Sequence, residues 1–417
     1  MQNTCFTKVS KLFLSACLVS VFAVAIPASG QQASTSPASQ DVINQQLLDR
    51  VKQLEVELKQ LKQQPAVVAA APVPTPEPAP VVEAPRQNEV SERLKFRVFS
   101  DVGYAANDGK RVSNTFEIGS LDLFMTARLA PKVTVLGEVL FVSQSDNSIV
   151  PDVERLLLQY RHNDYFGFGV GRYHTTIGYY NTAFHQGAWF ETAIGRPYMY
   201  EFDDKLGFLP LQEVGVTVSG RIPSGKLGLT YVAEVGNGRN HASAEPAQNK
   251  NDANNGKSIN IAVSGHPAWV SGLDAGFSFY HDHLTFSDGV NHSETTTTAH
   301  VVYVTSNYEI LNEALLVRHS ATTGSQIFHT FGAYTQLSRR FGAYRPYFRY
   351  AYLNAPANDP IYGDPTDATL VTRRNGASLG LRYDFTAHSA FKLQYDRLAI
   401  RDQQTSNGLA GQFAFTF

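Results

Sequence analysis

The sequence has very little cysteine. Its two cysteines, Cys5 and Cys17, both lie within the first 30 residues, a stretch that reads as a cleaved signal peptide. The rest of the chain therefore offers no thiol nucleophile, no cysteine ligand for a structural zinc ion and no disulfide. A chain without cysteine also suits passage in an unfolded state through an oxidising compartment.

Strong net charge and long apolar runs are missing as well. The formal net charge is -2, which gives no electrostatic basis for binding nucleic acid. No apolar run after residue 30 reaches the roughly 18 residues of a membrane-spanning helix. The mean hydropathy of -0.21 is that of a soluble protein, but a transmembrane barrel gives similar values because its strands alternate. We find no phosphate-binding loop and no His-Glu-x-x-His motif, so we expect no enzyme, no cofactor and no metal site.

The N-terminal 30 residues have the three parts of a secretory signal. Lys8 and Lys11 form a positive region, residues 12–26 form an apolar region, and Ala28-Ser-Gly30 is a small-residue cleavage site. The sequence therefore predicts a signal peptide over 1–30 and a mature chain that begins at Gln31. The alternative is an uncleaved anchor helix, which the short apolar run disfavours.

Two further segments precede the main domain. In 31–64, Leu47, Val51, Leu54, Leu58 and Leu61 are spaced 4, 3, 4 and 3 residues apart, which predicts a short periplasmic coiled coil. A solitary amphipathic helix is the alternative, although one this short is marginal alone. The segment 65–90 contains seven prolines and is therefore expected to be an extended linker.

From 91 to 417 the apolar residues alternate with polar ones at period two. After Gly376, for example, Ala377, Leu379 and Leu381 would share one face, against Ser378 and Arg382 on the other. The connections alternate between short turns and longer polar loops, as in transmembrane barrels. We therefore predict an all-β, antiparallel transmembrane β-barrel of about sixteen strands; a soluble β-sandwich fits these long strands poorly. The expected strands are 94–104, 115–129, 132–144, 152–162, 165–176, 213–222, 226–237, 258–267, 271–284, 295–305, 307–320, 326–339, 343–354, 372–386, 389–401 and 407–417.

The chain ends in Phe413-Ala-Phe-Thr-Phe417, with three phenylalanines on one face of the last strand. With the signal peptide, this ending resembles the C-terminal strand of Gram-negative outer-membrane porins, and the resemblance covers about 91–417. It implies a sixteen- or eighteen-stranded and usually trimeric barrel in the outer membrane. We expect the last strand to close against the first near Leu94, Phe96 and Val98. The segment 166–178 is loosely similar to phosphate-selective porins, but their lysine-rich pore is absent, so that selectivity is not expected.

The longest connection, 177–212, follows the fifth strand. In the porins that the sequence resembles, the corresponding loop folds back into the barrel and narrows it. Trp189, Phe190 and Tyr198 make an exposed loop of this length unfavourable in water. The alternative is a loop packed outside the lumen or at a subunit contact. The candidate constriction residues from this loop and the barrel wall are His174, His185, Glu191, Arg196, Asp203, Asp204, Arg128, Arg155, Arg345, Arg349 and Arg382.

Strand parity also predicts which charges face the lumen. The expected inward basic residues are Lys95, Arg97, Arg128, Arg155, Arg161, Arg221, Arg345, Arg349, Arg374, Arg382 and Lys392. The expected inward acidic residues are Asp101, Asp122, Glu138, Glu234, Asp274, Asp384 and Asp396. The slight basic excess predicts a weak anion preference; the alternative is that these charges form ion pairs that stiffen the wall. His281-Asp-His283 is interpreted as a solvated loop rather than a metal pair.

These patterns together predict an outer-membrane porin for passive diffusion of small hydrophilic solutes or ions. Its expected partners are membrane lipid, these solutes and further copies of the chain, most simply as a trimer. An alternative function is an envelope tether, in which the coiled coil contacts peptidoglycan or another periplasmic partner. A specific channel for sugars or aromatic acids is a third possibility, because the barrel is rich in tyrosine and phenylalanine.

Overall fold

The computed structural model describes residues 94–109, 114–143, 148–184, 187–201, 208–239, 254–285, 291–321, 326–359, 361–362 and 373–417. The chain divides into two units, Met1–Val82 and Glu83–Phe417. The predicted signal peptide, coiled coil and proline-rich linker all lie outside the described residues. The same holds for His185, Asp203 and Asp204 among the predicted constriction residues.

The second unit is a closed antiparallel barrel of sixteen strands, which confirms the predicted fold. Each strand pairs with its neighbours in the chain, and β1 pairs with β16 to close the ring. The strands are β1 Leu94–Asn107, β2 Thr115–Ala130, β3 Val133–Ser143, β4 Ile149–Asn163, β5 Phe166–His174, β6 Gln212–Arg221, β7 Leu229–Gly236, β8 Ser258–Gly265, β9 Leu273–Thr285, β10 Asn291–Val304, β11 Tyr308–Ala321, β12 Ile327–Arg339, β13 Tyr344–Asn354, β14 Arg374–Thr386, β15 Ser389–Ile400 and β16 Ser406–Thr416. The described parts of the connections contain three short helices: α3 Tyr180–Ala183, η1 Tyr198–Tyr200 and η3 Gly225–Leu227.

The seam between β1 and β16 differs from the prediction. The paired residues run from Phe99 with Thr416 to Asn107 with Gly408, and Val98 and Phe417 exchange backbone hydrogen bonds of 2.9 and 3.1 Å. The start of β1, from Leu94 to Arg97, pairs with β2 instead. The predicted seam therefore lies too close to the start of β1, because the chain ends before β16 can reach Leu94.

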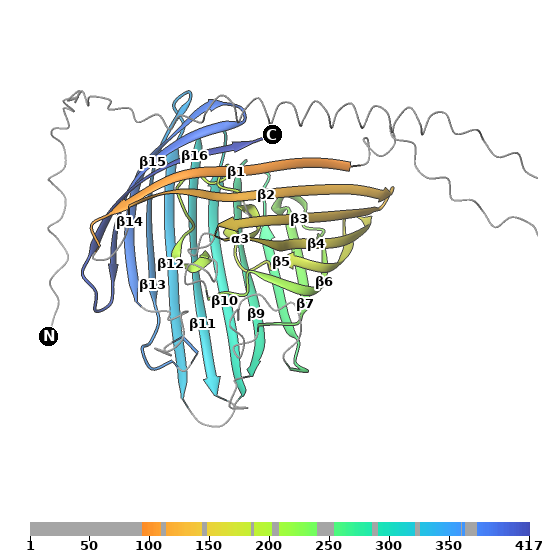
Figure 1. Ribbon diagram of the computed structural model, residues 1–417. Coiled ribbons are helices and arrows are strands. Elements are labelled where there is room, and N and C mark those ends of the chain that lie inside the picture. Colours follow the sequence, from red (N-terminus) through yellow and green to blue (C-terminus); the bar gives the residue numbers. More distant parts are fainter. Residues whose placement is uncertain are drawn as a thin grey trace, which may run out of the picture. The chain divides into compact units, whose positions relative to one another are not determined.

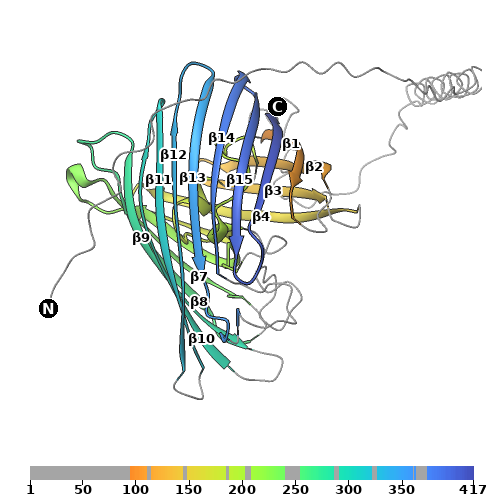
Figure 2. The same cartoon turned by 90° about the vertical axis from the view of Figure 1, so that its left-hand side faces the viewer.

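Strands of opposite walls run in very different directions. In Figure 1, β1–β4 cross the direction of β10–β13, and Figure 2 shows the same barrel turned by 90°. Strands of closed barrels tilt by about 40° from the barrel axis, so opposite walls cross at about 80°. At this tilt, strands of 8 to 16 residues rise by about 20 to 40 Å along the barrel axis, which is comparable to the height of a membrane.

The two faces of the wall have different chemistry. Apolar side chains such as Leu379 (62% exposed), Phe413 (52%) and Phe417 (74%) cover the outer face, as alternation predicts. Charged and hydroxyl side chains, among them Glu313 and Thr298, are buried on the inner face. A closed ring with an apolar exterior satisfies the backbone and faces lipid without a sheet edge.

Two strand boundaries differ from the prediction for identifiable reasons. β7 begins at Leu229 rather than 226, because Gly225–Leu227 form η3 and Gly228 has a φ of +60°. A Cβ on Gly228 would lie 2.5 Å from the His266 carbonyl oxygen, so glycine is required there. β10 begins at Asn291, four residues earlier than expected, because polar side chains occupy both of its faces at this end and no apolar stripe marks it.

No helix within the described ranges is both long enough and apolar enough to span a membrane.

The outer face gives a test of membrane placement. We expect Leu379→Arg, near the middle of β14 on the outer face, to lower the free energy of unfolding in lipid by about 2–4 kcal/mol. Phe385→Arg, at the end of the same strand and face, should cost only about 0–1 kcal/mol, because an arginine near the interface reaches water. Urea unfolding in lipid vesicles measures both. Equal costs would contradict this placement of the apolar band.

Candidate pore constriction

The described residues of the connection between β5 and β6, 175–184, 187–201 and 208–211, fold into the barrel lumen; we call them the inner loop. Its two ends are fastened together at the wall. The Thr175 amide donates to the Leu211 carbonyl at 3.0 Å, and its hydroxyl donates to the Pro210 carbonyl at 2.5 Å. The Asn181 side-chain amide donates to the carbonyls of both Thr175 and Leu211 at 2.9 Å. The two ends of the inner loop therefore leave the wall side by side, and α3 and η1 lie in the part of the loop between these ends.

Glu313 on β11 is the main carboxylate anchor of the inner loop. It accepts the backbone amides of Tyr179 and Tyr180 at 2.6 and 2.9 Å. It also accepts the hydroxyls of Tyr200 at 2.8 Å and of Tyr334 on β12 at 2.5 Å. Gly178, with a φ of +76°, makes this approach possible, since a Cβ there would lie 1.7 Å from the Tyr200 hydroxyl.

Basic side chains of β13–β15 hold the backbone of the same loop by its carbonyls. Arg349 donates to the carbonyls of Gly195 and Ile194 at 2.7 and 2.9 Å. Arg382 donates to those of Trp189 and Glu191 at 2.7 and 3.0 Å. Lys392 is fully buried, and its ammonium donates to those of Ala188 and Ala193 at 2.5 and 3.4 Å. We call Arg349, Arg382 and Lys392 the carbonyl clasp.

Apolar packing fills the space between the inner loop and the wall on this side. Tyr180 and Tyr200 of the loop stack at 5.7 Å between ring centroids, and both are almost completely buried. They belong to one buried cluster with Leu311 and Leu315 of β11 and Leu353 of β13. Such a core inside a barrel fixes the loop against β10–β13, so the loop narrows the lumen as a rigid element.

Two of the predicted constriction residues from the inner loop, Arg196 and Glu191, lie close together, and both stabilise the loop itself. Arg196 donates to the carbonyls of Tyr200 at 2.6 Å and Phe184 at 3.0 Å and lies over the Tyr180 ring at 5.2 Å. Glu191 is buried and accepts the Tyr180 hydroxyl at 3.1 Å. Both side chains therefore face the loop's own interior.

The predicted wall residues fall into separate places. Buried His174, at the end of β5, lies 3.7 Å from the Glu154 carboxylate. Arg155 pairs with Glu138 and lies 5.4 Å from the centre of the Phe124 ring. Arg345 lies 3.8 Å from the Glu309 carboxylate. Arg128 is exposed near the end of β2 where the short turns lie.

Charge is unevenly distributed around the lumen. Two parts of the inner wall, on either side of the inner loop, differ in charge: β6–β11 are rich in carboxylates, whereas β13–β15 carry five basic side chains together with Asp384 and Asp396. Further buried carboxylates, Asp101, Asp122, Glu138 and Glu154, lie on β1–β4. A pore between such walls would experience a transverse field. The inner carboxylates of β6–β11 are Glu213, Glu234, Asp274, Asp282, Glu294, Glu309 and Glu313, and the inner basic residues of β13–β15 are Arg345, Arg349, Arg374, Arg382 and Lys392.

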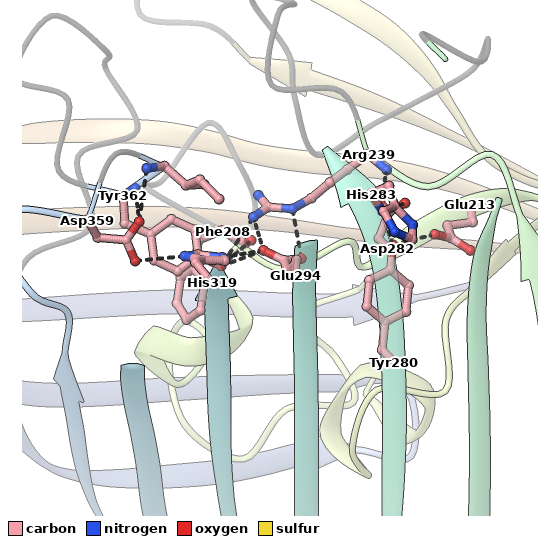
Figure 3. A network of polar contacts seen from close by, with 11 residues as sticks. Phe208, Glu213, Arg239, Tyr280, Asp282, His283, Glu294, His319, Asp359 and Tyr362 are labelled. Carbon is pink, nitrogen blue, oxygen red and sulfur yellow. Dashed lines mark hydrogen bonds and ion pairs between the residues drawn. The ribbon is translucent and has the colours of Figure 1, made fainter. Parts of the chain in front are cut away.

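A second buried network lies at the end of the barrel with the long loops, which we call the loop end (Figure 3). Arg239, from the connection after β7, donates to Glu294 of β10 at 3.0 Å. His319 of β11 bridges Glu294 and Asp359, with 2.7 Å between the ring nitrogens and each carboxylate. Burial alone would lower the pKa of the Arg239 guanidinium, but the Glu294 carboxylate outweighs it and holds that pKa above its usual range. The ion pair therefore stays charged. It attaches the connection after β7 to β10, and His319 attaches the connection after β13 to β11 through Asp359.

Tyrosines extend this network on both sides. The Tyr362 hydroxyl lies 3.2 Å from Glu294, and Tyr280 donates to Glu213 at 2.9 Å and to Asp282 at 3.1 Å (Figure 3). The Arg239 backbone amide donates to Asp282 at 2.8 Å. These contacts attach the described parts of the connections at the loop end to β9 and β10 and add polar support to the apolar cluster.

Sequence reasoning missed the strongest loop anchors. Glu313 and Glu309 were absent from the predicted lumen charges, although strand parity in β11 places both inward. Thr192 of the inner loop donates to Glu309 at 2.9 Å, and Gln394 of β15 exchanges hydrogen bonds of 2.9 and 3.1 Å with the backbone of Ile194. The signal for the glutamates was that they alternate in phase with Leu311 and Leu315, on the face opposite Ile310 and Leu316.

Two chemical alternatives find no support in the described part of the chain. Gly376-Ala-Ser378-Leu-Gly380 has the spacing of a hydrolase nucleophile elbow. It lies inside β14, however, and Ser378 donates to Asp396 at 2.5 Å. No group of three or more histidine, cysteine or acidic residues suited to a metal ion occurs among the described residues. His281-Asp-His283 lies on β9 rather than in the expected loop, with only Asp282 facing inward.

Removal of the Glu313 carboxylate should free the inner loop. We expect Glu313→Ala to raise the single-channel conductance in a planar bilayer, because two backbone amides and two tyrosine hydroxyls lose their acceptor. The free energy of unfolding should fall by about 3 kcal/mol or more, since each buried unsatisfied group costs about 1–3 kcal/mol. Asn312→Ala, the neighbouring outward residue, is the control and should leave conductance unchanged. A Glu313→Ala channel of wild-type conductance would show that the loop does not depend on this anchor.

Comparison with known proteins reveals similarity at the level of structure. No family model matches the sequence, and no curated protein matches it. Among solved structures, the anion-selective porin of Comamonas acidovorans aligns with a TM-score of 0.56 at 11% identity, over 78% of this chain and 99% of the porin. Salmonella typhi OmpF in complex with daunomycin gives 0.54 at 11% identity, over 78% and 97%. The outer membrane channel DcaP of Acinetobacter baumannii gives 0.52 at 10% identity, over the same shares.

These structural neighbours are outer-membrane porins and channels, and their similarity extends over nearly their whole length. The residues left out of the alignment amount to about a fifth of this chain, since 78% is covered. With its closed ring of sixteen antiparallel strands and this similarity, the chain has the fold of the outer-membrane porins.

Proposed function

We propose that this protein is an outer-membrane channel through which small hydrophilic solutes or ions diffuse passively. The observation that supports this function is the inner loop, which a carboxylate anchor and the carbonyl clasp hold inside a closed barrel. A barrel that served only as a membrane anchor would need no such element. Ser378 lies within a regular strand, which favours a channel over an enzyme.

The orientation and assembly belong to the same proposal. An even number of strands places both ends of the barrel on one side, the side with the short turns, which we call the turn end. In transmembrane barrels such turns face the periplasm. We further propose a trimer, the form in which a structural neighbour, OmpT of Vibrio cholerae, is described. The tether alternative depends on residues 31–90, outside the described part of the chain, and gains no support.

We also propose a weak anion preference. From the sequence alone, this preference rests on all the expected inward basic residues, but only some of them are available to a passing ion. The clasp residues are occupied by loop carbonyls and offer little to a passing ion. Lys95, Arg97, Arg128 and Arg161 are exposed near the turn end, and strand parity turns them toward the lumen. These four side chains would attract anions at that mouth.

Planar-bilayer recording tests both parts of this proposal. The purified protein is expected to form water-filled channels whose reversal potential in a salt gradient indicates a modest anion preference. Protein that inserts into the bilayer without conducting would exclude the channel function.

Charge removal at the turn end tests the selectivity. A unit charge about 10 Å from an ion in water contributes about 0.4 kcal/mol, so Arg128→Gln with Arg161→Gln should lower the anion-to-cation permeability ratio about twofold after salt screening. Arg397→Gln removes an exposed arginine from β15, where parity points it outward, and is the matched control. An unchanged ratio in the double variant would refute the assignment to this mouth.

A further inference from the structure

A row of basic side chains crosses the outer face of the barrel near the loop end. The register pairs His281 of β9 with Thr295, Thr295 of β10 with Arg318, and Arg318 of β11 with His329 of β12. All four residues have outward parity, so their side chains lie side by side across four strands. With strands about 4.8 Å apart, the row is about 14 Å long. We call His281, Arg318 and His329 the outer basic row.

Neighbouring contacts extend the row and orient it. The ring of His283, two residues further along β9 on the same face, lies 4.9 Å from that of His281. The His281 ring nitrogen lies 3.1 Å from the Thr295 hydroxyl. Arg318 donates to the Ser320 hydroxyl at 3.3 Å, which turns its guanidinium toward the loop end. These side chains thus form one polar strip on an otherwise apolar wall.

No carboxylate shares this surface. Within the described residues of β8–β12, no aspartate or glutamate has outward parity; all those present point into the lumen. The charge of Arg318 is therefore not neutralised by an acidic neighbour on its own face, and a ligand on this strip meets hydrogen-bond donors and positive charge. The inward acidic residues of these strands are Asp274, Asp282, Glu294, Glu309 and Glu313.

The strip also lies at a particular depth. Below it the outer face is apolar, with Phe279, Leu316 and Phe331 each more than 40% exposed. At the opposite rim Arg339 lies over the ring of Tyr308 at 5.3 Å. Arg318 is ten residues from Tyr308 on β11, which is about 33 Å along the strand and about 25 Å along the membrane normal at a tilt of about 40°.

That separation equals the height of the apolar band of outer-membrane barrels, about 25 Å. The outer basic row therefore lies where the hydrocarbon ends and the lipid headgroups begin. Phosphate groups are the anions at this level, and guanidinium groups bind them with paired, charge-assisted hydrogen bonds. An imidazole N–H adds a further donor without requiring a charged ring.

We propose that the outer basic row binds the phosphates of a phosphorylated glycolipid headgroup in the outer leaflet, as carried by lipid A. Its length admits two phosphates on one headgroup, with Arg318 at the centre. The apolar wall directly below receives the acyl chains. This surface is separate from the lumen, so lipid binding would position the barrel in the membrane without entering the channel.

The test uses the full-length protein in detergent, titrated with diphosphoryl lipid A. We expect the triple variant His281→Gln, Arg318→Gln, His329→Gln to bind it at least about tenfold more weakly, because charge-assisted hydrogen bonds to phosphate are lost. Arg339→Gln, an outward arginine at the opposite rim, is the control and should bind like the wild type. Lipid A stripped of phosphate should bind wild type and triple variant alike.

Several results would overturn the proposal. These are unchanged lipid A affinity in the triple variant, equal wild-type affinity for the dephosphorylated lipid, or full competition by inorganic phosphate at equimolar concentration. A variant that changes only the oligomeric state would assign the row to contact with a second copy. Wild-type conductance in the triple variant shows that the barrel has folded. A wild-type protein that binds lipid A without conducting would refute the channel function alone.

Discussion

A backbone in hydrocarbon must pair all of its hydrogen-bonding groups, and the rest of this structure depends on that constraint. The ring closes where β1, from Val98 to Asn107, forms hydrogen bonds with β16, so every strand has a partner on both sides. Closure divides every strand into an outer apolar face and an inner polar face. It also creates an interior that the chain must fill or leave to water, and the inner loop occupies part of it.

Many polar side chains of the barrel interior form hydrogen bonds with the inner loop. A loop inside a barrel carries carbonyl and amide groups that neither a strand nor bulk water satisfies, and each would be costly to bury unpaired. Glu313 accepts amides and phenols, while the carbonyl clasp donates to carbonyls. The same contacts stabilise the buried charges of Lys392 and Arg349, because each side chain donates to two peptide carbonyls. The carboxylates of β11 accept hydrogen bonds from the inner loop, and the basic residues of β13–β15 donate to its carbonyls. The difference in charge between these two parts of the wall follows from these roles.

The sequence predicted the barrel well, since alternation is a local property that each strand displays independently. All sixteen strands were located. The exceptions arise where alternation is not the governing signal, as at Gly228, where a turn requires glycine, and at Ser293–Thr295, where both faces are polar. The roles of site residues were less accessible. Parity placed Arg349 and Arg382 on the inner face, but their carbonyl partners lie more than 150 residues away in sequence, and no local pattern reveals the path of a loop.

The carbonyl clasp has a consequence for how the interior of this barrel can change over generations. Arg349 and Lys392 donate to peptide carbonyls, which every amino acid possesses, and Arg382 does the same while lying over the Trp189 ring at 4.8 Å. The side chains of Trp189, Phe190, Glu191 and Thr192 make contacts of their own. Substitutions at Ala188 and Ile194, whose side chains are only half-buried, can therefore alter what faces the lumen while the loop keeps its place. The wall acts as a fixed frame for a loop with replaceable side chains, so the proposed channel could acquire new permeants over generations without redesign of the barrel.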